Sequence, residues 1–273
     1  MNHVCAVVLA AGEGQRLRPL TAQVPKALCP VGNVPLLDRA MARVAALGLD
    51  CAVNACYLGG QVVAHVDGRA HVAVEPGDPW GTSGGLARLR DWVDGRAVLV
   101  GNADAYLADP SRPPGPDIAD LLSGWDGTTV RILGVPGSAG GREFGAHRFA
   151  GFSLLPWTVV RALPVERGAL VRTAWRPAER AGLLEVVGYR GDYLDTGTPA
   201  TYLAANLHAA GGKNLIDPTA TVAAAAERAV IGAGAVVAGP VTAAVVWPGG
   251  VVPADEHLLE AIRAVDGLTV AVT

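Results

Sequence analysis

The sequence has few aromatic residues, few charges and almost no lysine. Of its 273 residues, 5% are aromatic and 17% are charged, and Lys26 and Lys213 are the only lysines. The 22 Lys and Arg residues do not exceed the 25 Asp and Glu residues, whereas proteins that bind nucleic-acid backbones usually carry a basic excess. We therefore expect no nucleic-acid partner.

Cysteines and long apolar runs are also scarce. The four cysteines form no CxxC pair and have no histidine at zinc-ligand spacing, which favours reduced, buried thiols in a cytosolic protein. No apolar run reaches the roughly 18 residues that a membrane-spanning helix needs. The apolar segment Val4–Ala11 is too short for a signal peptide and ends in glycines. We expect a cytoplasmic protein with no membrane partner.

The first half of the chain alternates short Val- and Ala-rich runs with amphipathic stretches. Val4–Ala10 is continuously apolar, which is typical of a strand buried on both faces of a parallel sheet. Leu36–Leu47 carries apolar residues at helical spacing. The same reasoning predicts strands at Ala52–Asn54, Val72–Glu75 and Ala97–Val100, and helices at Gln61–Val66 and Gly84–Trp92. This succession predicts an α/β protein with a doubly wound sheet that binds ligands at the carboxyl ends of its strands.

From Val130 to about Tyr202 the pattern is mixed. Strands are expected at Val130–Gly134 and Phe149–Leu155 and a helix at Pro156–Leu163, all as an extension of the same domain. We therefore expect one domain over residues 1–212.

Beyond Lys213, apolar residues recur at steps of nearly six, with Gly and Pro between them. The recurring residues are Ile231, Val237, Val245-Val246 and Val251-Val252. The pattern resembles the hexapeptide repeat of a left-handed parallel β-helix, although the period slips at residues 243–245. We expect residues 213–273 to form a short β-helix-like tail of two or three turns that a helix at His257–Val265 closes. An irregular Ala/Gly/Val tail is the alternative.

A glycine-rich turn follows the first predicted strand. Gly12-Glu13-Gly14 lets the backbone approach a ligand closely and direct N–H groups at phosphate oxygens. Arg16 and Lys26 can add charge-assisted hydrogen bonds to the same anion. Leu17 stands where the dinucleotide fingerprint needs its third glycine, and no Gly-Lys-Ser/Thr of a P-loop follows.

The whole stretch from Leu9 to Pro35 resembles the signature of the sugar-1-phosphate nucleotidyltransferases (NDP-sugar pyrophosphorylases). Three further segments match in the family's order: Gly81-Thr82-Ser83-Gly84-Gly85, Val98–Asp104 and Tyr193–Pro199. The tail is similar to tails on the mannose-1-phosphate guanylyltransferase-like branch. The resemblance implies a Rossmann-like nucleotidyltransferase fold with a mixed sheet. It also implies Mg²⁺-dependent transfer of a nucleotidyl group from an NTP to a sugar- or cyclitol-1-phosphate, with release of pyrophosphate.

The resemblance also implies roles for individual residues. Arg16 would hold the departing pyrophosphate, and Lys26 the α-phosphate or the sugar phosphate. Asp104 and Asp195 would hold Mg²⁺. Asp104 follows a predicted buried strand, where a metal ligand belongs, with a helix cap as its alternative role, whereas Asp195 without the resemblance is an ordinary turn residue. Nucleotide contacts are implied for Leu9, Ala11, Gly12, Gly14, Glu75, Gly81, Thr82 and Asn102.

The sugar-binding half departs from the family pattern because the lysine that contacts the sugar phosphate is missing. We expect Arg142 or Arg148 to replace it, with Glu143 toward the sugar. Gly151 matches the family's strand glycine.

The nucleobase segment begins with Glu75, where uracil- and thymine-using relatives often carry glutamine. An ionised carboxylate only accepts hydrogen bonds, and guanine offers two adjacent donors, which favours GTP. UTP or dTTP, with Glu75 as a solvated turn residue, is the alternative within the family. An idle nucleotide-sensing homologue and, because of the tail, an acyltransferase are alternatives of other classes. A flat apolar β-helix face also favours a homo-oligomer.

Overall fold

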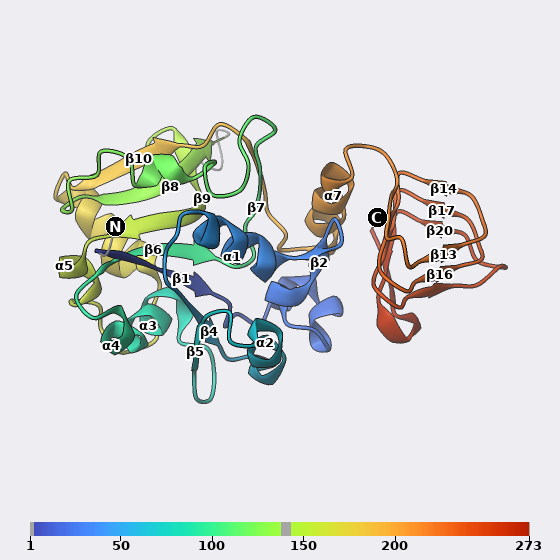
Figure 1. The fold of residues 1–273 in the computed structure, drawn as a ribbon, viewed down its shortest axis with the longest axis horizontal. Helices are drawn as coiled ribbons and strands as arrows, with labels where there is room; N and C mark the ends of the chain where they lie inside the picture. Colours follow the sequence, from blue (N-terminus) through green and yellow to red (C-terminus); the bar gives the residue numbers. More distant parts are fainter. Residues whose placement is uncertain (1–2, 138–142, 273) are drawn as a thin grey trace. The chain divides into compact units, whose positions relative to one another are not determined.

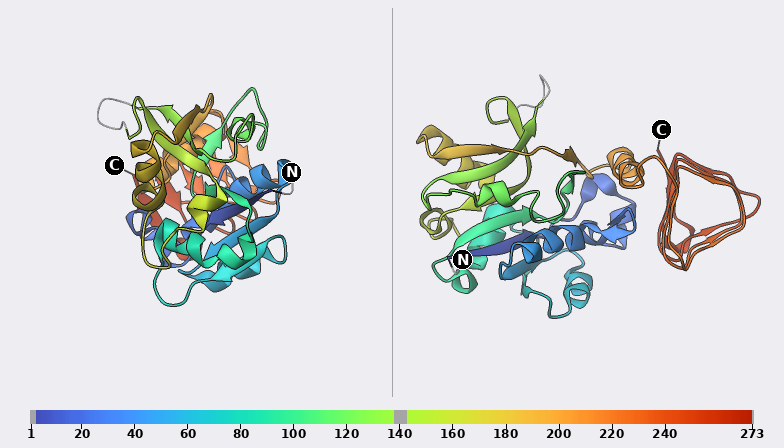
Figure 2. Two further views of the ribbon diagram at one scale, coloured as in Figure 1. Left: turned by 90° about the vertical axis from the view of Figure 1, so that its left-hand side faces the viewer. Right: turned by 45° about the horizontal axis from the view of Figure 1, so that its top comes forward.

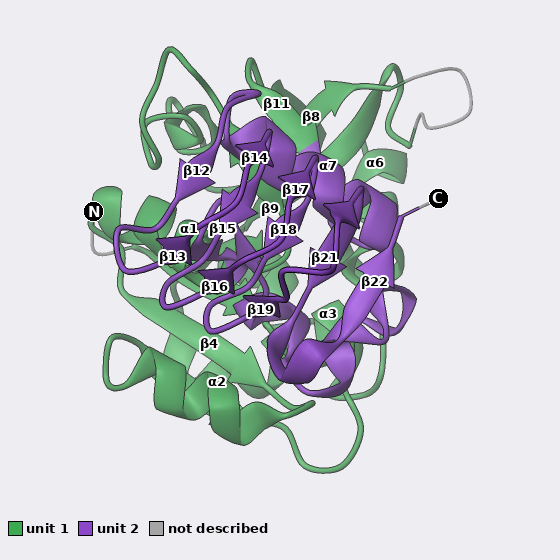
Figure 3. Ribbon diagram, turned by 90° about the vertical axis from the view of Figure 1, so that its right-hand side faces the viewer, with its two compact units in different colours: residues 1–13, 37–193 green, residues 14–36, 194–273 purple. Residues whose placement is uncertain are grey.

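The computed structural model describes residues 3–137 and 143–272, and the chain divides into two compact units (Figure 3). Unit 1 comprises residues 1–13 and 37–193, and unit 2 comprises residues 14–36 and 194–273. The chain passes from one unit to the other three times: inside the Gly12–Gly14 turn, between Leu36 and Leu37, and between Tyr193 and Leu194. Arg142 lies outside the described residues.

Unit 1 is built on a mixed sheet, which contains seven strands within the described residues and has the order β10-β8-β9-β6-β1-β4-β5 (Figure 1). Its strands are β1 (Val4–Leu9), β4 (Cys51–Ala55), β5 (His71–Val74), β6 (Ala97–Asn102), β8 (Val130–Pro136), β9 (His147–Leu155) and β10 (Leu184–Gly188). Neighbours pair in parallel except β9, which runs antiparallel to β6 and β8. The predicted mixed α/β sheet is confirmed.

The helices of this part of the chain overlap the predicted segments, except the helix at Arg176–Arg180, which was not predicted. They are α1 (Leu36–Ala46), α2 (Gly59–Val66), α3 (Gly81–Arg88), α4 (Arg90–Val93), α5 (Trp157–Val160) and α6 (Arg176–Arg180). The helix expected at Gly84–Trp92 is two helices, because Leu89 has φ −89° and ψ 5°, outside the helical region. The helix expected at Pro156–Leu163 is regular only over α5. The remaining elements are the short strands β7 (Tyr106–Ala108) and β11 (Asp192–Leu194), the 3-10 turn η4 (Ala119–Leu121) and the π-helical turn η5 (Val171–Trp175).

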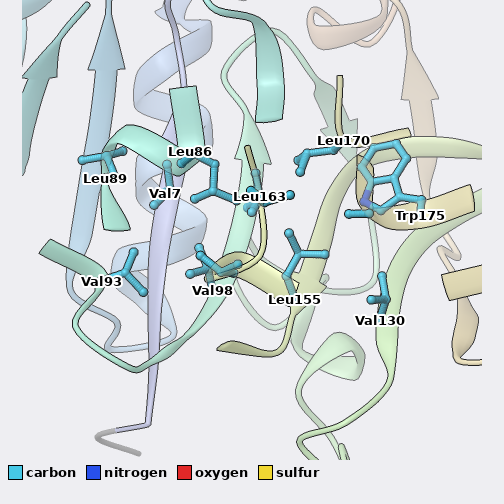
Figure 4. Packing of buried hydrophobic residues seen from close by; sticks show 14 of the residues in the cluster. Val7, Leu86, Leu89, Val93, Val98, Val130, Leu155, Leu163, Leu170 and Trp175 are labelled. Atoms are coloured by element: carbon cyan, nitrogen blue, oxygen red, sulfur yellow. The ribbon is translucent and has the colours of Figure 1, made fainter. Parts of the chain in front are cut away.

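The core of unit 1 joins the sheet to α3 and α4. Figure 4 shows Val7 of β1 and Val98 of β6 among Leu86, Leu89 and Val93, and all five belong to one buried cluster. These side chains are almost fully buried, and burying a Val or Leu side chain stabilises a fold by roughly 1.5–3 kcal/mol. This packing explains why every residue of β1 is apolar.

The four cysteines are free. Burial raises the pKa of the Cys5 thiol to about 11 and the pKa values of the Cys29 and Cys51 thiols to about 12. These three thiols therefore stay protonated and behave as small apolar side chains.

A buried ion pair fixes the Pro- and Gly-rich loop over residues 109–117. Arg43 of α1 donates from Nε to Asp117 Oδ2 at 2.9 Å and from Nη2 to the Leu107 carbonyl at 2.7 Å. The two charged side chains are 4% and 1% exposed. The hydroxyl of Tyr189 donates to the same carboxylate, and Gly115 N donates to its other oxygen. The pair is thus surrounded by hydrogen-bond partners, as a buried pair must be.

Unit 2 contains three short 3-10 turns, a hairpin, one helix and the tail. These are η1 (Gln15–Leu17), η2 (Leu20–Ala22), η3 (Lys26–Leu28), the pair β2 (Pro30–Val31) and β3 (Val34–Pro35), and α7 (Pro199–Ala209). Helix α7 begins at a capping box, in which Thr198 and Thr201 each bind the other's backbone N–H. Such a cap stabilises a helix start by about 1 kcal/mol.

The tail is a parallel coil of very short strands, and its cross-section is triangular (Figure 2, right). One column of strands is β12 (Leu215–Ile216), β15 (Val230–Ile231), β18 (Val245–Val246) and β21 (Ala261–Arg263). The second is β13 (Thr221–Val222), β16 (Val236–Val237) and β19 (Val251–Val252), and the third is β14 (Ala226–Glu227), β17 (Val241–Thr242) and β20 (Leu258–Leu259). A final strand, β22 (Thr269–Ala271), pairs antiparallel with β21. The predicted β-helix-like tail is confirmed.

The period of the coil explains the slip seen in the sequence. Register partners such as Leu215, Val230 and Val245 lie 15 residues apart, whereas three hexapeptides would make a coil of about 18 residues. The side of the triangle that runs from β14 to β15, and from β17 to β18 in the next coil, is the shortest. It ends at a corner residue with positive φ, which is Arg228 at +51° in the first case and Ala243 at +48° in the second. The shortened corner at Ala243 is the apparent slip.

The helix expected at His257–Val265 is wrong. This segment forms β20 and β21, in which Leu258 pairs with Val241 and Ile262 with Val245. Leu258 and Ile262 are buried, so these apolar side chains complete the columns of the coil. Packing in the coil therefore overrides the local helical spacing.

Among the residues that the structure describes, no helix is both long and apolar enough to cross a membrane.

Removing the Arg43 side of the buried ion pair should be costly. Arg43→Met leaves Asp117 buried without its counter-ion, and we expect the free energy of unfolding to fall by about 3–5 kcal/mol. Arg167→Met is the matched control, because its pair with Asp78 is 61% and 73% exposed and should contribute less than about 1 kcal/mol. Urea unfolding of both variants measures the difference, and equal losses would contradict a structural role for the buried pair.

Candidate functional site

The central strand β1 ends level with its two neighbours. Leu9 is in register with Asn54 of β4 on one side and with Asn102 of β6 on the other. The Leu9 carbonyl also accepts a hydrogen bond from Ala103 N at 3.0 Å. The structure thus brings the predicted residues Leu9 and Asn102 together at the carboxyl edge of the sheet, where ligands bind in folds of this class. Ala11, two residues on, accepts from Tyr57 N at 3.5 Å.

The two glycines of the turn differ in what they allow. A Cβ on Gly12 would meet no described atom within 4 Å. Gly14 has φ +62°, and a Cβ there would lie 2.8 Å from Cβ of Lys26. Gly14 is therefore needed for its left-handed backbone and for the close approach of Lys26. Its carbonyl accepts from the Thr21 hydroxyl at 2.9 Å, which fixes the turn at Gly14 within unit 2.

Arg16 and Asp195 form a second pair within unit 2. Arg16 Nη1 lies 3.9 Å from Asp195 Oδ2, and the two side chains are 71% and 42% exposed. An exposed pair at this distance contributes little to stability. Gly197 keeps the space beside it open, because a Cβ there would lie 2.7 Å from Arg16 Nη2. A guanidinium and a carboxylate thus face solvent side by side, available to bind a phosphate and a cation.

Asp104 lies in unit 1, in the turn between β6 and β7, and is half-buried. The turn closes with a hydrogen bond from Ala105 N to the Asn102 carbonyl at 3.2 Å. Gly151 of β9 has φ +84°, and a Cβ there would lie 2.3 Å from Cβ of Ala105. Gly151 therefore lets β9 pass beside the residue that follows Asp104.

Glu75 is buried and hydrogen-bonded, which excludes the alternative of a solvated turn residue. Its side chain is 4% exposed. Oε1 accepts from Asn54 Nδ2 at 2.7 Å, and Oε2 accepts from Trp80 N at 2.8 Å. Asn54 in turn accepts from Ala10 N through Oδ1 at 2.7 Å. Two buried polar side chains therefore tie together the ends of β1, β4 and β5.

Asn54 is a residue that the sequence reasoning missed. It is 2% exposed, and its signal was the one amide in an otherwise apolar strand, at that strand's carboxyl end. The network also explains Gly85 of α3, where a Cβ would lie 2.5 Å from Asn54 Nδ2 and 2.6 Å from Glu75 Oε1. Helix α3 thus lies so close to the Asn54–Glu75 hydrogen bond that a side chain at position 85 would collide with it.

The first turn of α3 contacts the segment 166–170. A Cβ on Gly81 would lie 2.3 Å from the Gly168 carbonyl oxygen. The Thr82 hydroxyl accepts from Leu170 N at 2.8 Å. The predicted nucleotide residues Gly81 and Thr82 therefore also fix this loop against α3.

Two of the predicted sugar-phosphate residues have partners near β9. Arg148 donates from Nη2 to the Tyr193 carbonyl at 3.3 Å, and its guanidinium carbon lies 4.9 Å from the centre of the Tyr193 ring. Glu143 is exposed, and its Oε2 accepts from Phe149 N at 3.1 Å. Arg148 thus has a fixed orientation, and Glu143 is an exposed carboxylate with one bond to the backbone of β9.

Comparison with known families now adds to this geometry. Residues 6–128 match the model of the MobA-like NTP transferase domain. This segment is thus similar to an NTP transferase domain over less than half of the chain. The resemblance found in the sequence is thereby confirmed, and the domain covers Leu9, Gly12, Arg16, Lys26, Glu75, Gly81 and Asp104.

Curated relatives match over less than half of the chain. An N-acetylmuramate alpha-1-phosphate uridylyltransferase from Neisseria meningitidis is 36% identical over 106 residues, which are 36% of this chain and 46% of that protein. A mannose-1-phosphate guanylyltransferase from Mycobacterium tuberculosis is 33% identical over 129 residues, 44% of this chain and 33% of that protein. The matched part thus spans between a third and a half of these relatives' lengths.

Solved structures match over a longer stretch at lower identity. HddC from Yersinia pseudotuberculosis has a TM-score of 0.59 at 18% identity and covers 75% of this chain and 98% of its own. UDP-glucose pyrophosphorylase from Acinetobacter baumanii has a TM-score of 0.57 at 14% identity and covers 75% and 92%. These likenesses show that the fold is shared.

The carboxylates at the two predicted metal positions are of a type that suits magnesium. Among the described residues, no group of three or more His, Cys, Asp or Glu side chains could hold a metal ion. Mg²⁺ does not require one, because it commonly binds one or two carboxylates, keeps several waters and takes its other ligands from substrate phosphates. Asp104 and Asp195, which belong to different units, are hard oxygen donors of this type.

Glu75→Gln should destabilise the fold. The carboxylate accepts from two protein donors, whereas a glutamine has one oxygen and must turn its NH₂ toward one of them. Leaving a buried donor unpaired should lower the free energy of unfolding by about 1–3 kcal/mol. Glu179→Gln, at an ion pair with both side chains 38% exposed, is the control and should change little. Equal stability of Glu75→Gln and the parent in urea unfolding would show that the network is dispensable.

Proposed function

We propose that the chain transfers a nucleotidyl group from an NTP to a sugar- or cyclitol-1-phosphate and releases pyrophosphate. The observation that carries this proposal is the Arg16–Asp195 pair, a solvent-facing cation and carboxylate on a chain whose residues 6–128 match an NTP transferase domain. In this proposal residues 1–212 act as the nucleotidyltransferase domain and residues 213–273 as its tail.

The proposed reaction needs charge neutralisation and positioning more than proton transfer. An ionised oxygen of the sugar phosphate attacks the α-phosphorus, a new O–P bond forms, and the bond to the β-phosphate oxygen breaks as pyrophosphate leaves. The attacking oxygen is already deprotonated at pH 7, so a general base is unnecessary. Arg16 would hold the leaving pyrophosphate, and Lys26 the α-phosphate or the sugar phosphate. Mg²⁺ on Asp104 and Asp195 would neutralise phosphate charge.

GTP is the proposed nucleotide. Each oxygen of a carboxylate can accept two hydrogen bonds, and each Glu75 oxygen uses one for the protein. The remaining capacity suits the two adjacent donors of guanine, whereas uracil and thymine present one donor between acceptors. The backbone of Leu9, Ala11, Gly12, Gly14, Gly81, Thr82 and Asn102 would line the rest of the nucleotide. UTP or dTTP remains the alternative, since a uridylyltransferase is among the relatives.

For the second substrate we propose a sugar phosphate held from β9. Arg148 replaces the missing lysine with a fixed guanidinium, which can bind a phosphate in a bidentate manner. Glu143 would accept from sugar hydroxyls beside Gly151, and Arg142 is retained as the second candidate cation.

The decisive experiment assays pyrophosphate release with each of the common NTPs against a panel of sugar-1-phosphates and cyclitol phosphates. We expect release that needs both substrates and Mg²⁺, with GTP used best. Preference for UTP or dTTP would overturn the guanine assignment and leave the transferase standing. Failure of every combination would favour the idle, nucleotide-sensing alternative.

Removing either carboxylate charge should abolish most turnover. Asp104→Asn and Asp195→Asn keep the side-chain size but remove the charge that a hard cation requires. Each should lower kcat by at least about a hundredfold, as expected for loss of a main electrostatic contribution. Asp50→Asn, at a side chain that is 80% exposed, is the control and should keep parental turnover. Near-parental kcat in a folded Asp104 or Asp195 variant would remove that residue from the site.

We also propose that the tail mediates homo-oligomerisation. Val236 and Val251 are register neighbours on β16 and β19 and are 45% and 49% exposed. Burying such a pair against a second copy is favourable. Replacing both by serine should lower the mass measured by light scattering, and an unchanged mass would contradict this assignment.

A further inference from the structure

We propose that the C-terminal tail positions Lys26 for catalysis, through Trp247, Tyr202 and Asn33. This inference rests on the proposed function of Lys26. It assigns positioning roles to tail and helix residues that lie far from Lys26 in the sequence. All of the contacts that carry it lie within unit 2.

The hairpin that follows Lys26 cannot hold itself in place. η3 begins at Lys26, and its last hydrogen bond, from Cys29 N to the Lys26 carbonyl at 3.1 Å, leads directly into β2. Strands β2 and β3 have two residues each. A two-stranded hairpin is at best marginally stable alone, so the position of η3 depends on what the hairpin contacts.

The first support is a hydrogen-bond relay from the tail. Trp247, in the turn after β18, donates from Nε1 to the Tyr202 hydroxyl at 3.0 Å. The same hydroxyl donates to the carbonyl of Pro30 in β2. Burial raises the pKa of the Tyr202 phenol well above its ordinary value, so the hydroxyl keeps the proton that it donates. Tyr202 and Trp247 are 0% and 3% exposed, and their rings meet edge to face at 6.3 Å.

The second support consists of two amide side chains at the turn of the hairpin. Asn206 of α7 accepts from Gly32 N at 2.9 Å, and Asn33 Nδ2 donates to the Ile231 carbonyl in β15 at 2.9 Å. Asn33 has φ +62°, a conformation that asparagine and glycine tolerate best. One bond thus joins the turn to α7 and the other joins it directly to the tail.

The same helix follows the proposed metal ligand. Asp195 lies three residues before the cap of α7 at Thr198, and α7 carries both Tyr202 and Asn206. Lys26 packs on Gly14, and Arg16 lies beside Asp195. Unit 2 therefore contains, in one frame with the tail and α7, the two residues proposed to bind phosphates, Arg16 and Lys26, and the proposed metal ligand Asp195. Because electrostatic catalysis depends on groups fixed in advance, loosening this frame should lower kcat more than it changes KM.

The test uses Trp247→Phe and Asn33→Gly. Trp247→Phe keeps an aromatic ring but removes the donor to Tyr202. Asn33→Gly keeps the positive φ but removes the donor to Ile231. If the Trp247 variant folds poorly, the Asn33 variant still decides the test. Trp125→Phe is the matched control, because the Trp125 indole also donates to a carbonyl, that of Thr129 at 2.8 Å, but belongs to unit 1.

The first readout does not depend on activity. Lys26 and Lys213 are the only lysines, so mass spectrometry after timed acylation with an N-hydroxysuccinimide ester reports both rates in one sample. Lys26 is 8% exposed, and losing one hydrogen bond of its support should raise its acylation rate about fivefold. The rate at Lys213 should not change, and Trp125→Phe should match the parent at both lysines. An unchanged Lys26 rate in both test variants, or equal rises at both lysines, would overturn the inference.

The second readout is steady-state kinetics. We expect kcat for pyrophosphate release to fall about fivefold in each test variant, the effect of one hydrogen bond, with KM for the NTP changed by less than about twofold. A rise in KM at parental kcat would instead mean that the tail supports only substrate binding. A parent that releases no pyrophosphate would refute the proposed function, while the acylation rates would still decide whether the tail positions Lys26.

Discussion

The buried hydrogen bond from Asn54 to Glu75 is the interaction on which the carboxyl edge of the unit 1 sheet depends. It joins two parallel strands at the end of their ladder, beside the last backbone hydrogen bond, which Glu75 N donates to the Ala55 carbonyl at 2.8 Å. Through Ala10 N and Trp80 N the same two side chains bind the end of β1 and the segment before α3. A buried carboxylate needs such hydrogen-bond partners, because an unpaired buried charge is costly. Asn54, one of the partners of Glu75, is itself held by the bond from Ala10 N. The end of β1, from which the glycine turn begins, therefore has a fixed position.

Unit 2 meets a different constraint, because the residues proposed to bind phosphates lie on 3-10 turns and a minimal hairpin. Such elements bury little apolar surface of their own, and their backbone groups need partners from outside. Tyr202 and Asn206 supply two of these partners, to the Pro30 carbonyl and to Gly32 N, and the Asn33 side chain of the hairpin donates to the Ile231 carbonyl of the tail. The tail can offer this support because its short strands pair with one another in successive coils. This pairing fixes the Ile231 carbonyl, which accepts from Asn33, and the Trp247 indole follows β18 and donates to Tyr202.

Much of the fold follows from hydrophobic periodicity. The apolar runs at β1, β4, β5 and β6 and the helical spacing of α1 are strong local signals that tertiary packing reinforces. The segment His257–Val265 shows the limit of such signals. Its spacing suits a helix, but Leu258 and Ile262 are register partners of Val241 and Val245 in the coil. The 15-residue period was equally hidden, because the corner at Ala243 adopts a positive φ that glycine usually provides.

The candidate site was predictable where a motif names a residue and unpredictable where the fold supplies a partner. Gly14, Lys26 and Asp104 stand in matched motifs, and the structure gives Gly14 and Gly151 steric reasons that agree with those motifs. The partners of Glu75 could not be read in this way, since Asn54 lies 21 residues away and the chain between them forms a helix and a strand. The same holds for Trp247, whose contact with Tyr202 spans 45 residues.

A residue can therefore occupy a motif position and still owe its geometry to a part of the chain that carries no motif. Lys26 illustrates this, because its neighbours in the sequence are 3-10 turns that could adopt several arrangements. Within unit 2, the arrangement seen is the one in which the Pro30 carbonyl, Gly32 N and the Asn33 amide all have partners at once. Since each unpaired buried polar group would cost about 1–3 kcal/mol, three together select one position of the hairpin. Residues of α7 and the tail thus select the position of the hairpin, and the motif supplies only the charge of Lys26.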